Sequence, residues 1–417
     1  MRQRHLRIAR MGGAFLLMLA LLLCLPAAPA RAADSQWRNI VDVVAGEAYT
    51  AALRDDGQVL YTGRRSAYDP FEAEKWTGVE RLELAENWPN YLVGYFRDGS
   101  VRVGGPDDYG TFDLSSCRDV AQVQFSGAIA AVLHRDGRVS VVLAGGEQVN
   151  SWDQEAAALY QQRVPQWRDI TQVCFAYGEE GPVLVGLRRD GTLACTDAAW
   201  EKAHKDWDHV EQLFFTYLGG GVMGLRRDGT LLGTEDFAGG PWTKVARMYQ
   251  ASDSFFALTR DGRVLVGESG YRDDKRMRDV ASWRNVTQLG FDVNGIARFV
   301  PTALLADGTV AVPMPEEEEA YPPEYQWDTG SWSMVKTLYS GAYYTLGLRA
   351  DGTVLATGGE FDKAPFVDAV GRWTDIAALF PSCTYETAEA HIVGLRMDGT
   401  LVAAGNNECG QCGVNSF

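Results

Sequence analysis

Three short groups of residues have side chains that could bind a metal ion or react. The first is residues 203–210, AHKDWDHV, which bring together His204, Asp206, Asp208 and His209. Imidazole and carboxylate groups are common zinc ligands. However, Trp207 within this segment belongs to a repeated pattern described below, so the segment joins two repeat units. Its charged side chains are therefore predicted to be solvated, and no metal site is expected.

The second group is the run Glu316 to Glu319, which lies in a long insertion that also contains Pro313, Pro315, Pro322 and Pro323. Carboxylates of this kind could hold calcium. A run of like charges in a proline-rich stretch is more typical of a solvated loop, and that is the interpretation favoured here.

The third group is the cysteines. Cys409-x-x-Cys412 has redox spacing, but the βαβ setting of thioredoxin-like motifs is absent. A local disulfide or two free thiols is expected instead, and Cys174 and Cys195 could pair if their strand registers oppose. No serine-nucleophile elbow, phosphate-binding glycine loop or zinc-protease motif is present. The sequence thus predicts a protein that is not an enzyme and needs no metal or cofactor.

The N-terminus predicts export. Four arginines precede an apolar run from Met11 to Leu25, and small residues around Ala30 to Ala32 fit a cleavage site. The apolar run is short for a membrane span of about 20 residues. Residues 1–33 are therefore predicted to be a signal peptide and residues 34–417 the mature domain, which is secreted or held in the cell envelope without stable membrane insertion.

The charge of the mature chain excludes one class of partner. Residues 1–33 contain five arginines and no carboxylate, so their removal leaves 34 basic and 55 acidic residues, a net charge of −21. Such a field repels phosphate backbones. No nucleic-acid partner is expected.

The mature chain contains nine copies of one unit. An Asp-Gly pair recurs at Asp56, Asp98, Asp136, Asp190, Asp228, Asp261, Asp307, Asp351 and Asp398. About twenty residues before each pair comes a Trp, which Cys117 replaces in the third unit. Apolar residues follow at two fixed positions in all nine units. A fixed period of this kind is the signature of a repeat architecture.

Each unit is predicted to form three strands. The Asp-Gly pair between apolar strands predicts a hairpin with a type I′ turn between the second and third strands. Four residues before each Asp, eight of nine units have Ala or Gly, and the next residue is always apolar and large. One strand face is therefore expected to pack large side chains, while the other admits the next blade or the crowded ring centre.

Such units bury both faces only when they stack side by side. We expect an all-β fold, a β-propeller of nine repeat units forming seven to nine blades, because radial closure protects the strand edges. An open β-solenoid is the alternative, but neither end of the array carries an obvious polar cap.

The unit WxxVxxLxxG…GLRxDGTVxxxG resembles the regulator-of-chromosome-condensation (RCC1) repeat. The last copy is clearest, running from Trp373 through GLRMDGTLVAAGNN to GQCG. The resemblance implies a propeller, although that family has seven blades and most units here lack the Asn and Gln of the tail. The family's nucleotide exchange on a nuclear GTPase is not expected, because this chain is predicted to be exported and matches no exchange residues. It is more similar to the secreted bacterial β-lactamase-inhibitor protein II type, which implies protein binding.

The repeat also predicts where function lies. Asp-Gly turns of constant length gather at one end of the blades, and connections of variable length gather at the other, where binding usually occurs on a rigid scaffold. Aromatic anchors in these connections are the predicted contacts for an extracellular protein or glycan partner: Tyr68, Trp88, Tyr91, Trp152, Trp200, Tyr271, Tyr325 and Trp327. Each could instead pack onto its own blade. A propeller lyase or glycosidase with clustered loop carboxylates is the alternative function.

Overall fold

The computed structural model of the 417-residue chain describes residues 36–64, 72–85, 91–104, 111–147, 149–178, 181–215, 221–233, 241–251, 254–267, 275–294, 298–313, 329–341, 344–358, 366–382 and 390–414. The predicted signal peptide and the Glu316–Glu319 run lie outside these ranges. No helix among the described residues is long and apolar enough to cross a membrane.

The chain folds into nine three-stranded antiparallel sheets, each made by one repeat unit, and we number them as blades 1 to 9. The strands, grouped by blade, are β1 (Ile40–Ala45), β2 (Tyr49–Arg54), β3 (Val59–Gly63); β4 (Val79–Leu84), β5 (Leu92–Phe96), β6 (Val101–Gly104); β7 (Val120–Ser126), β8 (Ile129–His134), β9 (Val139–Leu143); β10 (Ile170–Gly178), β11 (Gly181–Arg188), β12 (Leu193–Cys195); β13 (Val210–Phe215), β14 (Val222–Arg226), β15 (Leu231–Leu232); β16 (Val245–Ala251), β17 (Ser254–Thr259), β18 (Val264–Val266); β19 (Val286–Asn294), β20 (Arg298–Leu305), β21 (Val310–Ala311); β22 (Val335–Gly341), β23 (Tyr344–Arg349), β24 (Val354–Gly358); β25 (Ile376–Pro381), β26 (His391–Arg396), β27 (Leu401–Gly405). The expected strand-turn-strand unit is confirmed in all nine copies.

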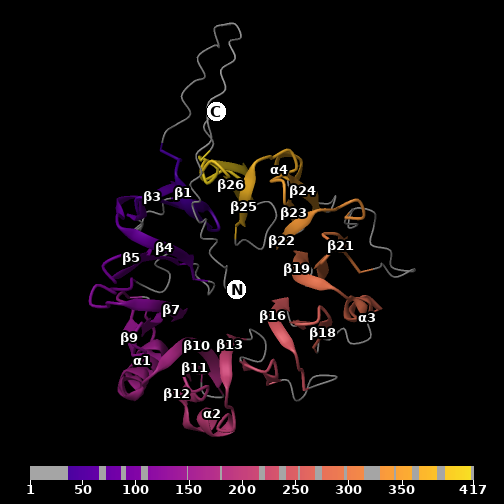
Figure 1. The fold of residues 1–417 in the computed structure, drawn as a ribbon. Helices are drawn as coiled ribbons and strands as arrows, with labels where there is room; N and C mark the ends of the chain where they lie inside the picture. Colours follow the sequence, from indigo (N-terminus) through magenta and orange to yellow (C-terminus); the bar gives the residue numbers. More distant parts are fainter. Residues whose placement is uncertain are drawn as a thin grey trace, which may run out of the picture.

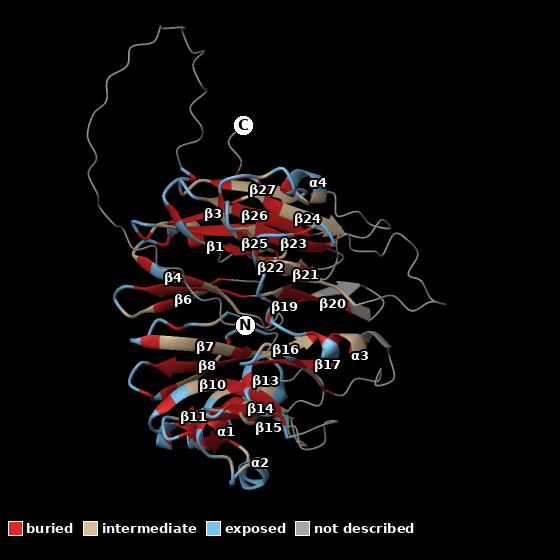
Figure 2. Cartoon of the chain, turned by 45° about the vertical axis from the view of Figure 1, so that its right-hand side comes forward, coloured by how far each residue is buried: buried red, intermediate tan, exposed pale blue. Residues whose placement is uncertain are grey.

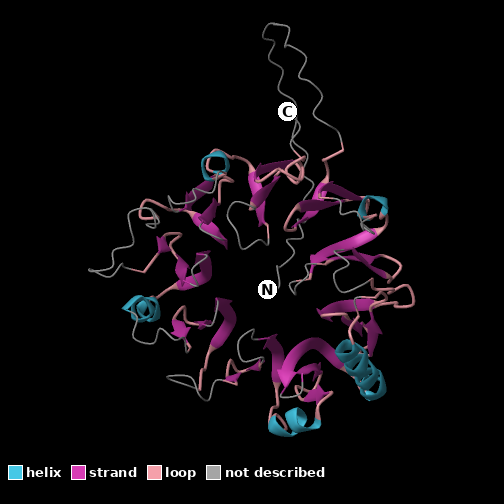
Figure 3. Ribbon diagram, turned by 180° about the vertical axis from the view of Figure 1, so that it is seen from behind, coloured by secondary structure: helices cyan, strands magenta, loops and turns pink. Residues whose placement is uncertain are grey.

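The blades form a ring in which the first strand of each blade lies nearest the centre (Figure 1). The helices lie on the outside of the ring, in connections between blades (Figure 3). They are η1 (Ala73–Lys75), α1 (Ser151–Arg163), η2 (Val164–Gln166), α2 (Ala198–Ala203), α3 (Lys275–Ser282) and α4 (Val367–Val370). The predicted propeller is confirmed, and it has nine blades.

The Asp-Gly pair forms a turn that differs from the predicted type I′. In blade 1 the Gly57 N–H donates to the Arg54 carbonyl, and the Arg54 N–H donates to the carbonyl of Gln58. Only the glycine of the pair has positive φ, and the same holds in the other eight turns. This pattern is a three-residue loop, a type I turn closed by a bulge glycine. The prediction of type I′ was wrong because the loop has one residue more than a two-residue hairpin.

The same turns join the blades to one another. The carbonyl of each turn glycine accepts a hydrogen bond from the first strand of the next blade, over 2.9–3.3 Å at all nine junctions. A Cβ on Gly191, for example, would lie 2.6 Å from the Cα of His209 in the next blade. Glycine is thus required both by its φ of +87° and by the close approach of backbone.

Apolar side chains fill the spaces between blades rather than the interior of any one blade. Each of the nine core clusters combines residues of two neighbouring blades. Tyr49 of blade 1, for instance, lies in one cluster with Trp76 of blade 2. Figure 2 shows the result, with buried strands stacked against one another and exposed residues concentrated in connections.

The repeated Trp explains the small residue in the second strand. A Cβ on Gly94 would lie 2.6 Å from Cζ3 of Trp76, and four other glycines in this position meet the Trp of their own unit at about the same distance. The expectation that the next blade or the ring centre occupies this space was therefore wrong. Blade 3 supports this relation: Cys117 replaces the Trp, Val132 replaces the small residue, and both lie in one core cluster.

The ring closes between blade 9 and blade 1. The Ile40 N–H donates to the Gly399 carbonyl over 3.0 Å, as at every other junction. The segment after β27 then covers this seam. Thr62 Oγ1 donates to the Gly410 carbonyl over 2.7 Å, and Thr50 Oγ1 donates to the Gln411 carbonyl over 2.8 Å. Closure thus uses the C-terminal tail rather than a strand exchanged between the ends.

Candidate binding surfaces of the ring

The two ends of the blades differ in regularity. Second and third strands are joined by four residues in every blade, and we call this end the turn face. First and second strands are joined at the opposite end, the loop face, by segments that range from residues 127–128 in blade 3 to residues 382–390 in blade 9. The predicted separation of constant and variable connections is confirmed.

Five of the eight predicted binding residues lie outside the described residues. They are Tyr68, Trp88, Tyr271, Tyr325 and Trp327. The other three, Tyr91, Trp152 and Trp200, have three different environments.

Tyr91 belongs to the core and is not available to a partner. Its side chain is 2 % exposed. Its ring centroid lies 4.7 Å from that of Phe125 in β7 and 5.5 Å from that of Phe112 in the connection between blades 2 and 3. The prediction was wrong for this residue because the position just before β5 faces the neighbouring blade. Tyr160, a further aromatic residue of these connections, is also buried.

Trp200 packs back onto its own connection. Asp197 caps α2 by accepting from the Trp200 N–H over 2.6 Å. The indole then stacks on His204, with ring centroids 3.6 Å apart, and His204 meets Trp207 edge-on at 4.8 Å. His204 is thereby held against two indoles, and among the described residues no group of His, Cys, Asp or Glu is arranged to hold a metal.

Trp152 is the one described residue of the eight that faces solvent. Its side chain is 76 % exposed, although a residue of this size is usually largely covered. It lies in the first turn of α1, which Asn150 caps by accepting from the Asp153 N–H over 2.9 Å. A Cβ on Gly127, in the blade 3 turn of the loop face, would lie 3.1 Å from Asp153. The start of α1 therefore lies at the loop face.

The helix that carries Trp152 is anchored from beneath. Ala157 and Tyr160 are buried in the cluster between blades 3 and 4, and the Tyr160 hydroxyl donates to the Pro182 carbonyl. Burial raises the pKa of Tyr160, so its hydroxyl keeps its proton. Trp152 is thus an exposed indole on a fixed support.

Two further exposed apolar residues lie on α1 and on β10, the next strand along the chain. Leu159 is 40 % exposed and lies seven positions after Trp152 on the same side of α1. Tyr177 is 53 % exposed at the loop-face end of β10 in blade 4. We call Trp152, Leu159 and Tyr177 the aromatic patch. Sequence reasoning missed Leu159 and Tyr177, although the spacing of Leu159 from Trp152 on a helix could have signalled the first.

The described cysteines are free thiols. Cys174 and Cys195 lie on either side of Val185, each paired with it across a strand, so they do not oppose one another. Burial raises the pKa of the Cys174 thiol to about 12 and that of Cys412 to about 11. Thiols held in the protonated form are poor nucleophiles.

The turn face is electrostatically regular. In eight of nine turns the Asp carboxylate accepts from the N–H two residues later, as Asp307 does from Thr309 over 2.9 Å. Hydrogen bonds of this kind favour the charged form. The Thr309 hydroxyl and then the Thr309 N–H lower the pKa of Asp307, and contacts within the turn likewise lower the pKa of the other eight carboxyls.

No protein-family model matches the chain, and no curated protein matches it significantly. Solved structures with a similar path of the chain include the computationally designed Ika8 protein. It is 13 % identical over 89 % of this chain and 97 % of that one, at a TM-score of 0.37. The CRINKLY WD40 ectodomain of the Arabidopsis thaliana receptor kinase ACR4 is 10 % identical over 78 % of this chain and 95 % of that one (TM-score 0.36). Prp20p from Saccharomyces cerevisiae, which a second structure names as yeast RCC1, is 13 % identical over 80 % and 73 % (TM-score 0.31).

Proposed function

We propose that the chain is an exported, non-enzymatic scaffold that binds a protein partner through its loop face. The nine-bladed ring supplies the support, and the connections of variable length supply the specificity. The aromatic patch on α1 and β10 is the anchor in this proposal. Export follows from the basic and apolar leader at residues 1–33.

The observation that carries the proposal is the exposure of Trp152. An indole 76 % exposed on a capped, anchored helix leaves apolar area in contact with water. Covering that area with a partner removes it from water, and tryptophan is enriched among residues that dominate binding energy. Because the helix is already fixed, ordering costs little on binding.

Several features support a binding role over catalysis. The described histidines are scattered or packed, as His204 is between Trp200 and Trp207. The described thiols with resolved shifts have raised pKa values. The RCC1-like repeat and the similarity to the secreted β-lactamase-inhibitor type, both drawn from the sequence, support the same class.

A capture experiment tests the proposal. Mature protein is immobilised and exposed to culture supernatant and cell-envelope fractions, in parallel with a double variant, Trp152→Ala and Tyr177→Ala. The matched control is Met334→Ala, because Met334 is similarly exposed, at 56 %, but lies on the turn face. We expect one saturable protein partner that the double variant retains about tenfold less well, a loss of about 1.4 kcal/mol.

Three results would contradict the proposal: equal capture by all three proteins, retention of a glycan fraction in place of a protein, or turnover of a substrate panel. Unfolding curves of the variants provide the control for structure. Exposed substitutions of this kind change stability by less than about 0.5 kcal/mol.

A further inference from the structure

A second surface lies on the turn face at blade 6. Four basic side chains are exposed there, Lys244, Arg247, Arg260 and Arg263, and we call them the basic patch. Asp261 pairs with two of them. The hydrogen bonds from Thr230 lower the pKa of a second carboxylate, Asp228, and Arg260 helps to lower it further. This concentration of positive charge occurs in a chain with 55 acidic and 39 basic residues.

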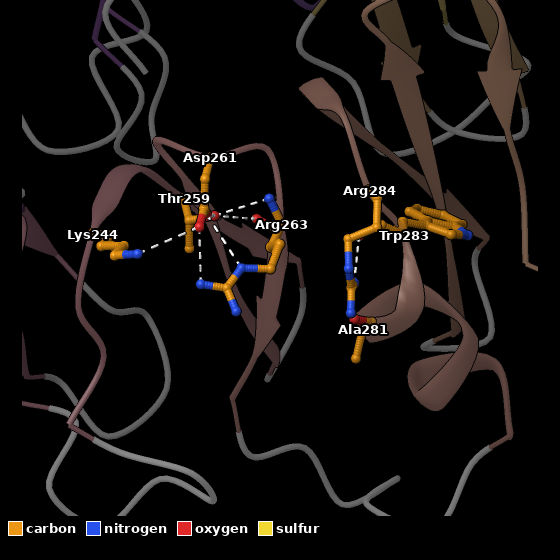
Figure 4. Close-up of polar contacts among 7 residues, drawn as sticks. All are labelled: Lys244, Thr259, Asp261, Arg263, Ala281, Trp283 and Arg284. Carbon is orange, nitrogen blue, oxygen red and sulfur yellow. Dashed lines mark hydrogen bonds and ion pairs between the residues drawn. The ribbon is translucent and has the colours of Figure 1, made fainter.

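Position 263 carries a positive charge, as the equivalent Arg138 does in blade 3, where the Arg138 N–H donates to Asp136 in the usual way. In five other turns this position is a Thr that follows the glycine, and its N–H donates to the turn Asp. In blade 6 the Thr259 hydroxyl lies between the two groups. It donates to Asp261 over 2.5 Å and accepts from the Arg263 N–H over 2.9 Å. Figure 4 shows this arrangement, with Lys244 and Arg263 both directed at Asp261. The turn thus keeps its hydrogen bonds while position 263 carries a guanidinium.

Position 247 shows a second alteration. The equivalent residue in blades 3, 4 and 7 is a Gln whose side chain clamps the first strand of the next blade. Gln288, for example, donates to the Leu338 carbonyl over 2.7 Å and accepts from the Leu338 N–H over 3.0 Å. Blade 6 has Arg247 instead, with an exposed side chain. Blade 2 also has an arginine here, but Arg81 donates to the Ala121 carbonyl of the next blade over 3.1 Å and pairs with Glu83. Arg247 differs because neither contact is described for it, and local departures of this kind mark functional positions.

The charges of the patch are only partly neutralised. Lys244 and Arg263 lie 3.7 and 3.0 Å from Asp261, whose pKa falls to about 2, chiefly through the Thr259 hydroxyl and Arg263. Arg260 donates only to the Arg227 carbonyl, over 2.9 Å, among the bonds described. Arg247 and Arg260 have no carboxylate within ion-pair distance in the described part of the chain.

The neighbouring basic residues behave differently. Arg227 pairs with Glu211 over 2.7 Å. Arg284 turns back onto the carbonyls of Ala281, Ser282 and Trp283, as Figure 4 shows for Ala281 and Trp283. Arg118 and Arg168 bond the carbonyls that precede them in the same way. These arginines make all their described contacts with the fold. In the basic patch, Arg260 also bonds the neighbouring blade and Arg263 pairs within its own turn, whereas Arg247 has no described hydrogen bond or ion pair.

We propose that the basic patch binds an acidic segment of a second protein, one with closely spaced Asp or Glu side chains. Three of the four side chains are arginines, whose planar fork matches a carboxylate with two parallel hydrogen bonds. The turn face is a rigid base because each turn is bonded to the next blade. This site is separate from the aromatic patch and does not depend on it.

A membrane fits the patch less well than an acidic protein segment. Stable attachment to a bilayer requires apolar side chains beside the basic ones. The large apolar residues exposed on the turn face within the described residues are Val41, Met334 and Met397, in blades 1, 8 and 9. Blade 6 exposes none of them.

The test uses full-length mature protein and a fluorescein-labelled oligo-glutamate peptide, with binding followed by fluorescence anisotropy. The variant carries Lys244→Asn, Arg247→Gln and Arg263→Thr, which are residues found at these positions in other blades. We expect salt-sensitive binding, and a loss of affinity of about tenfold in the variant. Because each replacement restores the pattern of the repeat, the thermal midpoint of the variant should not fall.

The matched control removes three basic residues from the turns of blades 3 and 4, by Arg135→Ala, Arg138→Thr and Arg189→Ala. It has the same net charge as the first variant and should bind the peptide like the unmodified protein. Equal loss in both variants, or no salt-sensitive binding at all, would overturn the proposal. So would binding to vesicles of phosphatidylglycerol and phosphatidylcholine in preference to the peptide. Capture by the aromatic patch, being on the other face, should be unaffected by either triple variant.

Discussion

The turn face and the loop face of this ring are made by the same repeat, yet one is uniform and the other is not. At the turn face, every glycine carbonyl accepts a hydrogen bond from the next blade, so a change in turn length would break a junction. At the loop face, the first-to-second-strand connections take no part in those nine junction bonds, and they vary from residues 127–128 to residues 382–390. The turns therefore have constant length because each one bonds the next blade. The loop-face connections can vary in length because they make none of these bonds.

The comparison also separates two kinds of exposed surface. The aromatic patch on the loop face uses apolar area on an added helix, α1. The basic patch on the turn face uses charges substituted into fixed positions of the repeat. The first can change by insertion, whereas the second can change only by substitution, because the turn must keep its length.

The sharpest test of this difference replaces one glycine on each face. Gly191→Ala would place a Cβ 2.6 Å from the Cα of His209, at a φ of +87°, and should destabilise the fold by about 3–4 kcal/mol. Gly145 follows β9 at the loop face, where a Cβ would lie 3.9 Å from the Thr111 carbonyl oxygen, an ordinary contact. Gly145→Ala should change stability by less than about 0.5 kcal/mol. Urea unfolding of the two variants measures both values, and similar losses would refute the claim that junctions fix the turn face.

Acid should affect the two faces over different pH ranges. His391 is fully buried at the seam between blades 9 and 1, with its Nε2 3.1 Å from Thr50 Oγ1, and burial lowers its pKa to about 4. The unfolded chain, with a His pKa of about 6.5, binds the proton first. Stability is therefore lost as pH falls from about 6.5 to about 4, by about 3 kcal/mol in all.

The turn carboxylates act below that range. Their pKa values are lowered, so their contribution is present above the unfolded pKa of 3.8 and is lost as pH falls through the folded values. Free energies of unfolding at pH 7 and pH 4.5 should differ in the unmodified protein and differ much less in His391→Gln. An unchanged difference in that variant would assign the acid sensitivity to other groups.

The smallest effect expected is the loss of one glutamine clamp. Gln172 joins blades 4 and 5 by two hydrogen bonds of 2.9 Å to the N–H and carbonyl of Leu213. Gln172→Ala should cost about 1–2 kcal/mol, because two partly buried backbone groups lose a partner. The reciprocal change, Arg247→Gln in blade 6, should be neutral or stabilising. Thermal unfolding of Gln172→Ala and Arg247→Gln measures both effects. A marked loss of stability in Arg247→Gln would show that Arg247 itself stabilises blade 6, against this prediction.

The sequence predicted much of the fold because the repeat carries it. The Asp-Gly pairs placed nine turns, and the fixed apolar columns placed the strands on either side of them. The sequence was less successful with contacts between units. Gly94 is small because of Trp76, a residue eighteen positions earlier, and the type of turn depended on one further residue in the loop.

The candidate site was predicted least well, for a physical reason. Tyr91, Trp152 and Trp200 are all aromatic residues in connections, and sequence alone treats them alike. Tyr91 is covered by Phe112 and Phe125, and Trp200 by His204 at the end of its helix, while Trp152 is 76 % exposed. Which of three similar side chains is free depends on neighbours that the sequence does not place.

By itself, the sequence determined the number of units, their three strands and the separation of constant from variable connections, because these follow from spacing along one chain. The tertiary structure decided how the ring closes, which aromatic residues are exposed, and that Lys244 and Arg263 meet at Asp261. Those properties depend on distances between residues from different strands and different blades, which only the packing of nine sheets around a common centre sets.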